Sequence, residues 1–293
     1  MARTNRREGK RPPNRETWIG RYKAKLRYRL ERPFDTVWRK VLARTVPYID
    51  PQQNTLSIPR GKAWASVPPG VIPLTAEVVD ACLAIFQERR GTLDGYMRQR
   101  DKELATYFYD VAHEGGFGAH SQLLIDYMAQ PTILNGVMRY LGDVPLLQGV
   151  KLYWTPQNDK MVSSQQWHMD GGDIRQLKLF LYLNDIDERA GPLTIIPAKE
   201  SREVVKKYDY VKGKLPDDQV AACVPRDKWV QLTGSKGTLV VCDTSSCFHF
   251  GGRARSGERL FLEFHYTTSA PFYYNKIPDF PAADWKQRMV LAS

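Results

Sequence analysis

The sequence predicts an α+β protein in which a group of helices precedes a mainly β core. Two observations predict this class. Apolar residues recur at helical spacing between residues 75 and 141. From about residue 147 onward, short β-type runs alternate with turn residues, a pattern typical of an all-β sandwich or barrel. The length of 293 residues fits one large domain or two small ones and allows a sizeable core.

The first helix is expected over residues 75–90. Its apolar residues fall on one face at helical spacing, and they are Val78, Val79, Cys82, Leu83 and Phe86. Thr75 is the candidate N-cap, and Gly91 follows the last turn as a stop. The preceding residues 46–74 contain six prolines and are predicted to be an extended linker or a wrapping segment.

Two further helices are expected within residues 119–141. Pro131 is a natural first residue of the second helix, and Gly142 is its expected stop. His113 and His120 flank a Gly-rich loop just before these helices, and mobile loops of this kind often cover binding sites. The two histidines are therefore minor candidates for substrate contact.

Seven strand-type runs follow, each bounded by turn residues. They cover residues 149–154, 165–170, 176–183, 192–197, 228–232, 237–243 and 259–268. Alternation by two places successive side chains on opposite faces of a strand. In 176–183 the apolar face consists of Leu177, Leu179, Leu181 and Leu183, and the other face of Lys178, Phe180 and Tyr182. The leucine face is expected to be buried, and the mixed face to line a polar cavity.

Three residues form a candidate metal site. His168 and Asp170 form an H-x-D pair, whose alternation points both side chains the same way. An isolated H-x-D is most often a surface pair. Here His249 follows the strand 237–243, and if that strand folds back beside the first, it completes a two-His, one-carboxylate face. Such a triad leaves positions open on an octahedral ion and is diagnostic of non-heme Fe(II) oxygenases.

An arginine follows at a suggestive distance. Arg259 lies ten residues after His249 and opens the run 259–268. Its guanidinium is suited to bind the far carboxylate of a dicarboxylate cosubstrate through two hydrogen bonds. Arg253 and Arg255 are rivals, but both lie in a Gly-rich turn and are less favoured.

The order of these motifs resembles the phytanoyl-CoA dioxygenase-like family of Fe(II)/2-oxoglutarate-dependent dioxygenases. The resemblance rests on QWHMD, LKLFLYLNDIDERAGPLTIIP, GTLVVCDTSSCFHFGG and RLFLEFHYTT, and it covers about residues 145–270. It implies a double-stranded β-helix, the jelly-roll or cupin-like barrel, buttressed by the N-terminal helices. One departure is the segment Pro197–Ser201, where the family often has Gly-Ser-His after its Pro-ending strand.

The resemblance implies roles for individual residues. His168, Asp170 and His249 would bind Fe(II), Arg259 the C5 carboxylate of 2-oxoglutarate, and O₂ would complete the reactants. Phe180 matches a position where the family often places an aromatic side chain beside the cosubstrate. Strand parity adds further candidates. Tyr182 and Thr194 are expected at the cosubstrate, and the expected substrate-lining residues are Lys151, Tyr153, Gln166, Lys178 and His265.

The net charge of +11 is unevenly placed. Residues 1–44 contain 15 Lys and Arg against 4 Asp and Glu, so the remainder is neutral. We therefore expect a basic N-terminal extension over 1–45, then the segment 46–74, and a dioxygenase domain over 75–293. That domain would contain helices over 75–142, a jelly roll over 147–270 and a tail over 271–293. A basic arm favours anionic partners, such as an acidic membrane surface or an anionic substrate carrier.

Several protein classes are excluded or disfavoured. No apolar window is long enough for a membrane span, and no secretory signal is evident. Four cysteines without a CxxC pair do not form a disulfide scaffold, which favours a cytoplasmic protein, with possible peripheral contact at the inner membrane surface. Nucleic acid is a disfavoured partner because the body carries no second basic stripe.

The expected activity is hydroxylation of an aliphatic C–H bond, with release of succinate and CO₂. The substrate would be a small molecule or a sugar- or lipid-linked compound. Two alternatives remain open. One is a non-catalytic jelly-roll binding protein that docks through its basic arm, and the other is a nucleic-acid- or protein-acting dioxygenase of the same chemistry. The intact set of candidate ligands counts against the first.

Overall fold

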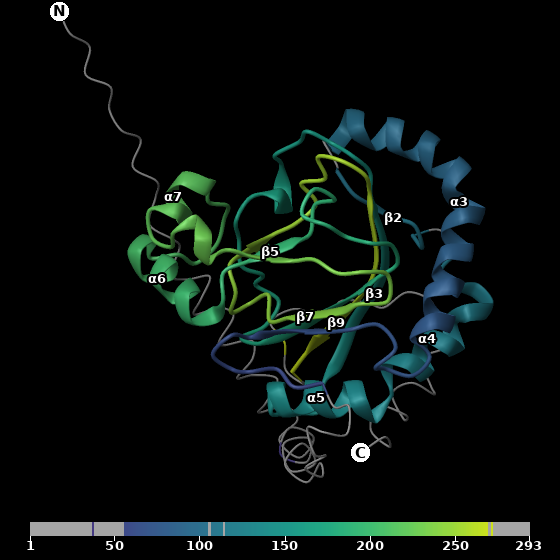
Figure 1. The fold of residues 1–293 in the computed structure, drawn as a ribbon, viewed down its shortest axis with the longest axis horizontal. Helices are drawn as coiled ribbons and strands as arrows, with labels where there is room; N and C mark the ends of the chain where they lie inside the picture. The colour runs from purple at the N-terminus through teal and green to yellow at the C-terminus, as the bar shows by residue number, and fades with distance from the viewer. Residues whose placement is uncertain (1–36, 38–55, 105–106, 114, 269–270, 272–293) are drawn as a thin grey trace, which may run out of the picture.

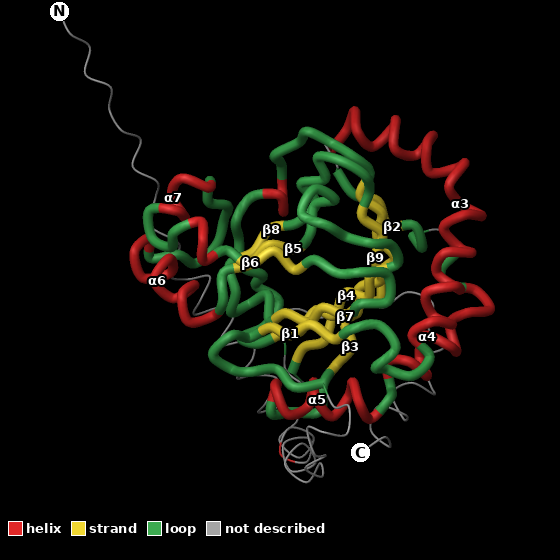
Figure 2. The backbone as a smooth tube through the Cα atoms, in the orientation of Figure 1, coloured by secondary structure: helices red, strands yellow, loops and turns green. Residues whose placement is uncertain are grey.

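Two antiparallel sheets form the β core of the computed structural model, which describes residues 37, 56–104, 107–113, 115–268 and 271 (Figures 1 and 2). The larger sheet has the order β1-β7-β4-β9-β3-β2. Its strands are β1 Trp64–Val67, β2 Tyr109–Asp110, β3 Leu146–Thr155, β4 Gln176–Tyr182, β7 Leu239–Cys242 and β9 Arg259–Thr267. The smaller sheet has the order β6-β5-β8 and consists of β5 Leu193–Ile195, β6 Val230–Leu232 and β8 His249–Phe250.

The alternation of sheets along the chain is that of a double-stranded β-helix. β3 and β4 lie in the larger sheet, β5 and β6 in the smaller, β7 in the larger, β8 in the smaller and β9 in the larger. The segment between β3 and β4 adds to the smaller sheet through an isolated antiparallel bridge between His168 and His249. The chain thus winds between two facing layers, and the expected fold class is confirmed.

The predicted 165–170 strand is reduced in the structure. A 3-10 helix covers Ser163–Gln165, and only residues 167 and 168 make isolated bridges. Trp167 bridges Leu215 on one side, and His168 bridges His249 on the other. The predicted common direction of the His168 and Asp170 side chains is nevertheless correct, because their ligand atoms lie close together.

Helices cover both sheets on their outer sides (Figure 1). α3 Thr75–Leu104, α4 Ser121–Met128 and α5 Pro131–Leu141 pack on the larger sheet, with which they share one hydrophobic cluster. α6 Ala198–Tyr208 and α7 Asp217–Ala221 lie beside the smaller sheet. A second cluster joins them to it, formed by Trp167, Ile196, Val204, Leu215, Val220, Val224, Phe248 and Phe250. We call this set the outer cluster.

Three helix predictions differ from the structure. Thr75 is the first helical residue, and its hydroxyl donates to the carbonyl of Ile72, so it does not cap the helix. The helix continues through Gly91 and Gly95 to Leu104, because each glycine costs only about 1 kcal/mol relative to alanine, too little to end a long helix. The helices α6 and α7 were not expected from the sequence. By contrast, Pro131 and Gly142 do bound α5, and Gly142 has the left-handed φ of 67°.

The segment 46–74 includes an edge strand, β1, which pairs with β7. The leucine face of β4 is fully buried, as parity predicts. The basic arm, apart from residue 37, and nearly all of the tail 271–293 lie outside the described residues. No helix in the described part of the chain is long and apolar enough to cross a membrane.

Candidate metal centre and anion pocket

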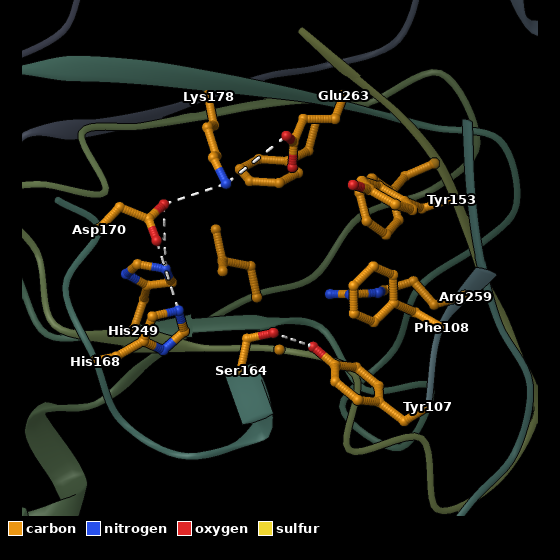
Figure 3. Close-up of a pocket in the computed structure, with 14 residues that line it drawn as sticks. Tyr107, Phe108, Tyr153, Ser164, His168, Asp170, Lys178, His249, Arg259 and Glu263 are labelled. Atoms are coloured by element: carbon orange, nitrogen blue, oxygen red, sulfur yellow. Dashed lines mark hydrogen bonds and ion pairs between the residues drawn. The ribbon is translucent and has the colours of Figure 1, made fainter. Parts of the chain in front are cut away.

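Three side chains from distant parts of the chain meet on one side of a cavity (Figure 3). His168 follows the loop after β3, Asp170 precedes β4, and His249 lies on β8. His168 Nε2 is 3.7 Å from Asp170 Oδ1, and His249 Nε2 is 3.9 Å from Asp170 Oδ2. One ligand atom from each residue lies within 4.8 Å of the others. This spacing suits a single ion held between them.

Backbone carbonyls orient both imidazoles. His168 Nδ1 lies 2.9 Å from the carbonyl oxygen of Gln166, and His249 Nδ1 lies 3.0 Å from that of Cys247. A proton on each Nδ1 satisfies these contacts and leaves each Nε2 with a free lone pair. Such outer hydrogen bonds fix the tautomer of metal-ligating histidines. The two Nε2 atoms are therefore prepared to bind a cation.

Burial keeps the imidazoles neutral. Burial first, and then the neighbouring His249, lower the pKa of His168 to about 3 against the opposing effect of Asp170. Burial also lowers the pKa of His249. Neutral imidazole is the form that coordinates a metal, so protons compete weakly for these two ligands.

The carboxylate of Asp170 is held ionised. Burial by itself raises its pKa, but Lys178 and then the two imidazoles outweigh burial and bring the pKa below its ordinary value. Lys178 Nζ lies 3.1 Å from Asp170 Oδ2, and the side-chain amide of Gln176 donates to the same oxygen at 3.1 Å. Two neutral nitrogens and one carboxylate match the donor set of a non-heme Fe(II) site, so the residues fit that ion.

Arg259 lies across the same cavity from the triad (Figure 3). Its side chain is buried, and its Nε has no hydrogen-bond partner. Burial lowers its pKa, and Tyr107, Tyr182 and Glu263 oppose that effect from nearby. Within the described residues, however, no carboxylate comes within ion-pair distance of it. A buried guanidinium without a counter-ion is costly, so this position calls for an anion from outside the chain.

The backbone makes room for this arginine. A Cβ at Gly251 would lie 2.8 Å from Arg259 Nη1, so only glycine lets the guanidinium lie against the chain. Gly252 has a φ of +78°, and a Cβ there would meet the ring of Tyr107 at 2.2 Å. The two glycines after His249 thus serve the site directly.

The cavity between the triad and Arg259 has a volume of about 150 Å³. Tyr107 and Phe108 form one wall, and the Tyr107 hydroxyl is 2.6 Å from Ser164 Oγ (Figure 3). The remaining lining residues are Tyr153, Lys178, Phe180, Leu193, Gly251, Phe261 and Glu263. The space is small, polar at both ends and aromatic in the middle. It therefore suits a short dicarboxylate.

A partly buried ion pair lies on the upper wall in Figure 3. Lys178 Nζ is 3.7 Å from Glu263 Oε1. Burial raises the pKa of Glu263, and Lys178 opposes this. Lys178 is thus shared between two carboxylates, Asp170 and Glu263, whereas Arg259 makes no ion pair with either of them.

The structure brings some of the expected residues to the cavity and not others. Phe180, Tyr153 and Lys178 line it. Those that do not line it are Tyr182, Thr194, Lys151, Gln166 and His265. The hydroxyl of Tyr182 donates to the carbonyl of Leu232, and Lys151 pairs with Asp110 at 2.7 Å. Parity gives the correct face in these strands, but it does not tell how far along the strand the cavity extends.

The other misplaced residues have their own partners or surroundings. The Gln166 amide donates to the carbonyl of Met161, and Thr194 lies on the opposite face of β5 from Leu193. His265 is beyond Glu263 on β9 and lies next to Lys178 in the sheet register. Neither His113 nor His120 lines the cavity.

The rival arginines point elsewhere. Arg253 makes a two-armed ion pair with Asp217, both contacts at 2.8 Å, and Arg255 pairs with Asp159 at 3.2 Å. Both line a separate hollow outside the smaller sheet. Arg259 is therefore the arginine of the cavity.

Seven of the lining residues were not predicted as site residues: Tyr107, Phe108, Ser164, Leu193, Gly251, Phe261 and Glu263. Tyr107 and Phe108 come from a loop and Ser164 from a three-residue 3-10 helix, and segments this irregular or short carry no periodicity to read. Glu263 carried a signal, since parity places it on the same face of β9 as Arg259 and Phe261.

The comparisons with known proteins give structures alone. Neither a protein-family model nor a curated protein matches the sequence. Among solved structures, EctD from S. alaskensis is 17% identical with a TM-score of 0.49, covering 78% of this chain and 82% of that one. The non-heme monooxygenase ThoJ is 16% identical with a TM-score of 0.49, covering 80% and 90%.

A third such structure is the non-heme alpha-ketoglutarate-dependent carbocyclase SnoK from nogalamycin biosynthesis. It is 14% identical with a TM-score of 0.48, covering 83% of this chain and 92% of that one. Because these identities and TM-scores are low, the chemistry of the site has to be argued from its own residues.

Proposed function

We propose that this protein is a non-heme Fe(II)- and 2-oxoglutarate-dependent oxygenase. The observation that supports it best is the pairing of two features in one cavity. A two-His, one-carboxylate set lies at one end, and a buried arginine without a counter-ion lies at the other. A metal alone would need only the first feature, and an anion-binding protein only the second.

When bound, Fe(II) with 2-oxoglutarate and O₂ supplies the oxidising power for attack on an unactivated C–H bond, with succinate and CO₂ as co-products. His168, Asp170 and His249 hold the ion and leave further positions open. Arg259 binds the distal carboxylate of the cosubstrate and so orients its other end toward the ion. Tyr107 and Phe108 exclude water from the space between Arg259 and the ion.

We further propose that the reaction is hydroxylation of an aliphatic C–H bond in a small-molecule, sugar-linked or lipid-linked substrate. The small cavity is filled by the cosubstrate, so this substrate approaches from the side of Asp170 and Lys178. Those two side chains are each about a fifth exposed, more than the two imidazoles are. Docking of residues 1–45 on an acidic membrane surface remains a proposal from their charge alone.

The test is an anaerobic titration of the purified protein with Fe(II) and 2-oxoglutarate. A keto acid chelated to iron in such an open site gives a weak visible charge-transfer band near about 500 nm. We expect this band in the wild type, its loss in His168→Ala, and at least a ~10-fold higher 2-oxoglutarate requirement in Arg259→Ala.

Arg255→Ala is the matched control, because Arg255 lies four residues before Arg259 in the sequence but outside the cavity. It should titrate as the wild type does. Absence of the band in the wild type would refute the proposed function and favour a non-catalytic binding protein. Equal effects of the two arginine substitutions would refute the role of Arg259.

A further inference from the structure

A lysine from the segment between α6 and α7 lies beside the metal triad. Trp167 and Leu215 exchange two backbone hydrogen bonds, of 3.2 and 2.9 Å, in an antiparallel bridge. In that register Lys214 lies directly across from His168. The segment around Leu215 therefore extends the smaller sheet by one position and ends next to a proposed metal ligand.

The register also fixes the face. Trp167 and Leu215 both pack in the outer cluster, away from the barrel interior. Neighbouring residues in an extended chain point to opposite faces. Lys214 therefore shares the inner face with His168.

The electrostatic surroundings agree with this placement. Lys214 is half-buried, and burial is the main reason why its pKa is lowered, to about 8, with Asp170 opposing and Lys178 adding to that effect. Lys214 also acts on the pKa of both imidazoles. The lysine thus lies near the triad, close enough to interact electrostatically with Asp170 and Lys178.

Lys214 lacks a counter-ion of its own. Among the described residues, Asp170 is the one carboxylate that interacts with it, and Asp170 already contacts Lys178 and Gln176 and belongs to the metal set. Lys151, Arg253 and Arg255 each have a carboxylate partner. Arg259 and Lys214 do not, and Lys214 is outside the cosubstrate cavity.

We propose that Lys214 binds an anionic group of the substrate, a carboxylate or a phosphate, and thereby places the C–H bond to be oxidised over the metal. This inference rests on the proposed function. The inference extends the proposed function by naming an acid as the substrate class and Lys214 as the residue that selects this acid. A compact ammonium on a flexible stem suits either acid group as a point charge.

The experiment measures binding and not turnover. The anaerobic protein is first loaded with Fe(II) and 2-oxoglutarate, and the visible band is recorded. Hexanoate, hexyl phosphate and neutral hexanamide are then titrated in by calorimetry. The variants are Lys214→Met, which removes the charge, and Lys214→Arg, which retains it. Lys206→Met, an exposed position on α6, is the matched control.

We expect the wild type and Lys206→Met to bind at least one of the two anions ~10-fold or more tightly than the amide. Lys214→Met should lose that preference, and Lys214→Arg should retain it within about threefold. An unchanged preference in Lys214→Met, or no preference in the wild type, would overturn the inference. Absence of the band before any probe is added would instead refute the proposed function, so the two failures are distinguishable.

Discussion

The two sheets of the barrel are held together in different ways. β3 and β9 of the larger sheet are paired continuously from Gly149–His265 to Thr155–Arg259. The smaller sheet has strands of two or three residues and gains its outer positions through isolated bridges. Yet the smaller sheet carries both histidines of the triad. Backbone ladders alone therefore cannot explain how the metal ligands are positioned.

Side-chain packing in the outer cluster supplies what the short strands lack. Trp167 lies edge-on to Phe250 with ring centroids 4.6 Å apart, and to Trp229 at 4.8 Å. Its neighbour in the chain is His168, and that of Phe250 is His249. The large aromatic residues thus hold the backbone from outside while the histidines point inside. The lesson is that precision at this site depends on the layer behind it.

The largest expected effect comes from removing an aromatic side chain of the outer cluster. Trp167→Ala removes a fully buried ring and should cost about 3–5 kcal/mol of unfolding free energy. Because it loosens the residue before His168, it should also weaken Fe(II) binding by ~10-fold or more. Urea unfolding and an anaerobic metal titration measure the two quantities.

Leu262→Ala in β9 is the matched variant in the larger sheet, where Leu262 is likewise fully buried. It should cost about 2–5 kcal/mol but leave Fe(II) affinity within about threefold of the wild type. If both variants weaken Fe(II) binding equally, the two sheets do not differ in the way described.

An effect of intermediate size is the loss of folding stability at low pH that buried histidines cause. Burial, with Lys178 second, lowers the pKa of His265 on β9 to about 3, whereas an unfolded histidine titrates near about 6.5. Between these values the unfolded chain binds a proton that the folded chain does not, so stability is lost as pH falls below about 6.5. Burial of His168 and His249 works in the same direction.

His265→Gln should therefore lose less stability than the wild type between pH 7.5 and 5, by about 2 kcal/mol. In this variant the remaining loss of stability comes from His168 and His249 in the smaller sheet. Bound metal should increase this loss, because protons then compete with the metal for the two histidines. Urea midpoints at both pH values, with and without Fe(II) under anaerobic conditions, measure this. An identical pH dependence of variant and wild type would contradict it.

The smallest effect concerns the loop wall. Tyr107→Phe removes the hydrogen bond to Ser164 but keeps the ring beside Gly252. We expect a stability cost of about 1 kcal/mol and unchanged Fe(II) affinity. The 2-oxoglutarate requirement should rise by about threefold, since the wall closes the arginine end. A loss of Fe(II) binding would show that the two ends of the cavity are not independent.

Long strands could be predicted from the sequence, whereas the shortest strands could not. The faces of β4 and β9 follow from alternation, because long strands repeat the pattern often enough to be read. The triad follows from local motifs and the family resemblance. β8 has two residues and β2 has two, too few to show a period. α6 did carry a signal, since Pro197 precedes it and Ala198, Ser201 and Val204 repeat at helical spacing.

Contacts between distant segments were beyond reach. The position of Lys214 depends on the bridge between Trp167 and Leu215, which joins segments 48 residues apart. Tyr107 meets Ser164 across 57 residues. Pairings of this kind are set by tertiary packing, and one sequence contains no periodic trace of them.

The central place of β9 in the larger sheet has a consequence for how the chain folds. β9 joins β4 to β3, so before it pairs, the sheet exists as two separate pieces. During synthesis β3 emerges early, because more than a hundred residues separate its end from the start of its partner strand β9. Barrel closure is thus a late event dominated by long-range contacts, which are slow to form. The same strand carries Arg259, so a nascent chain acquires its anion pocket only at the moment its barrel closes.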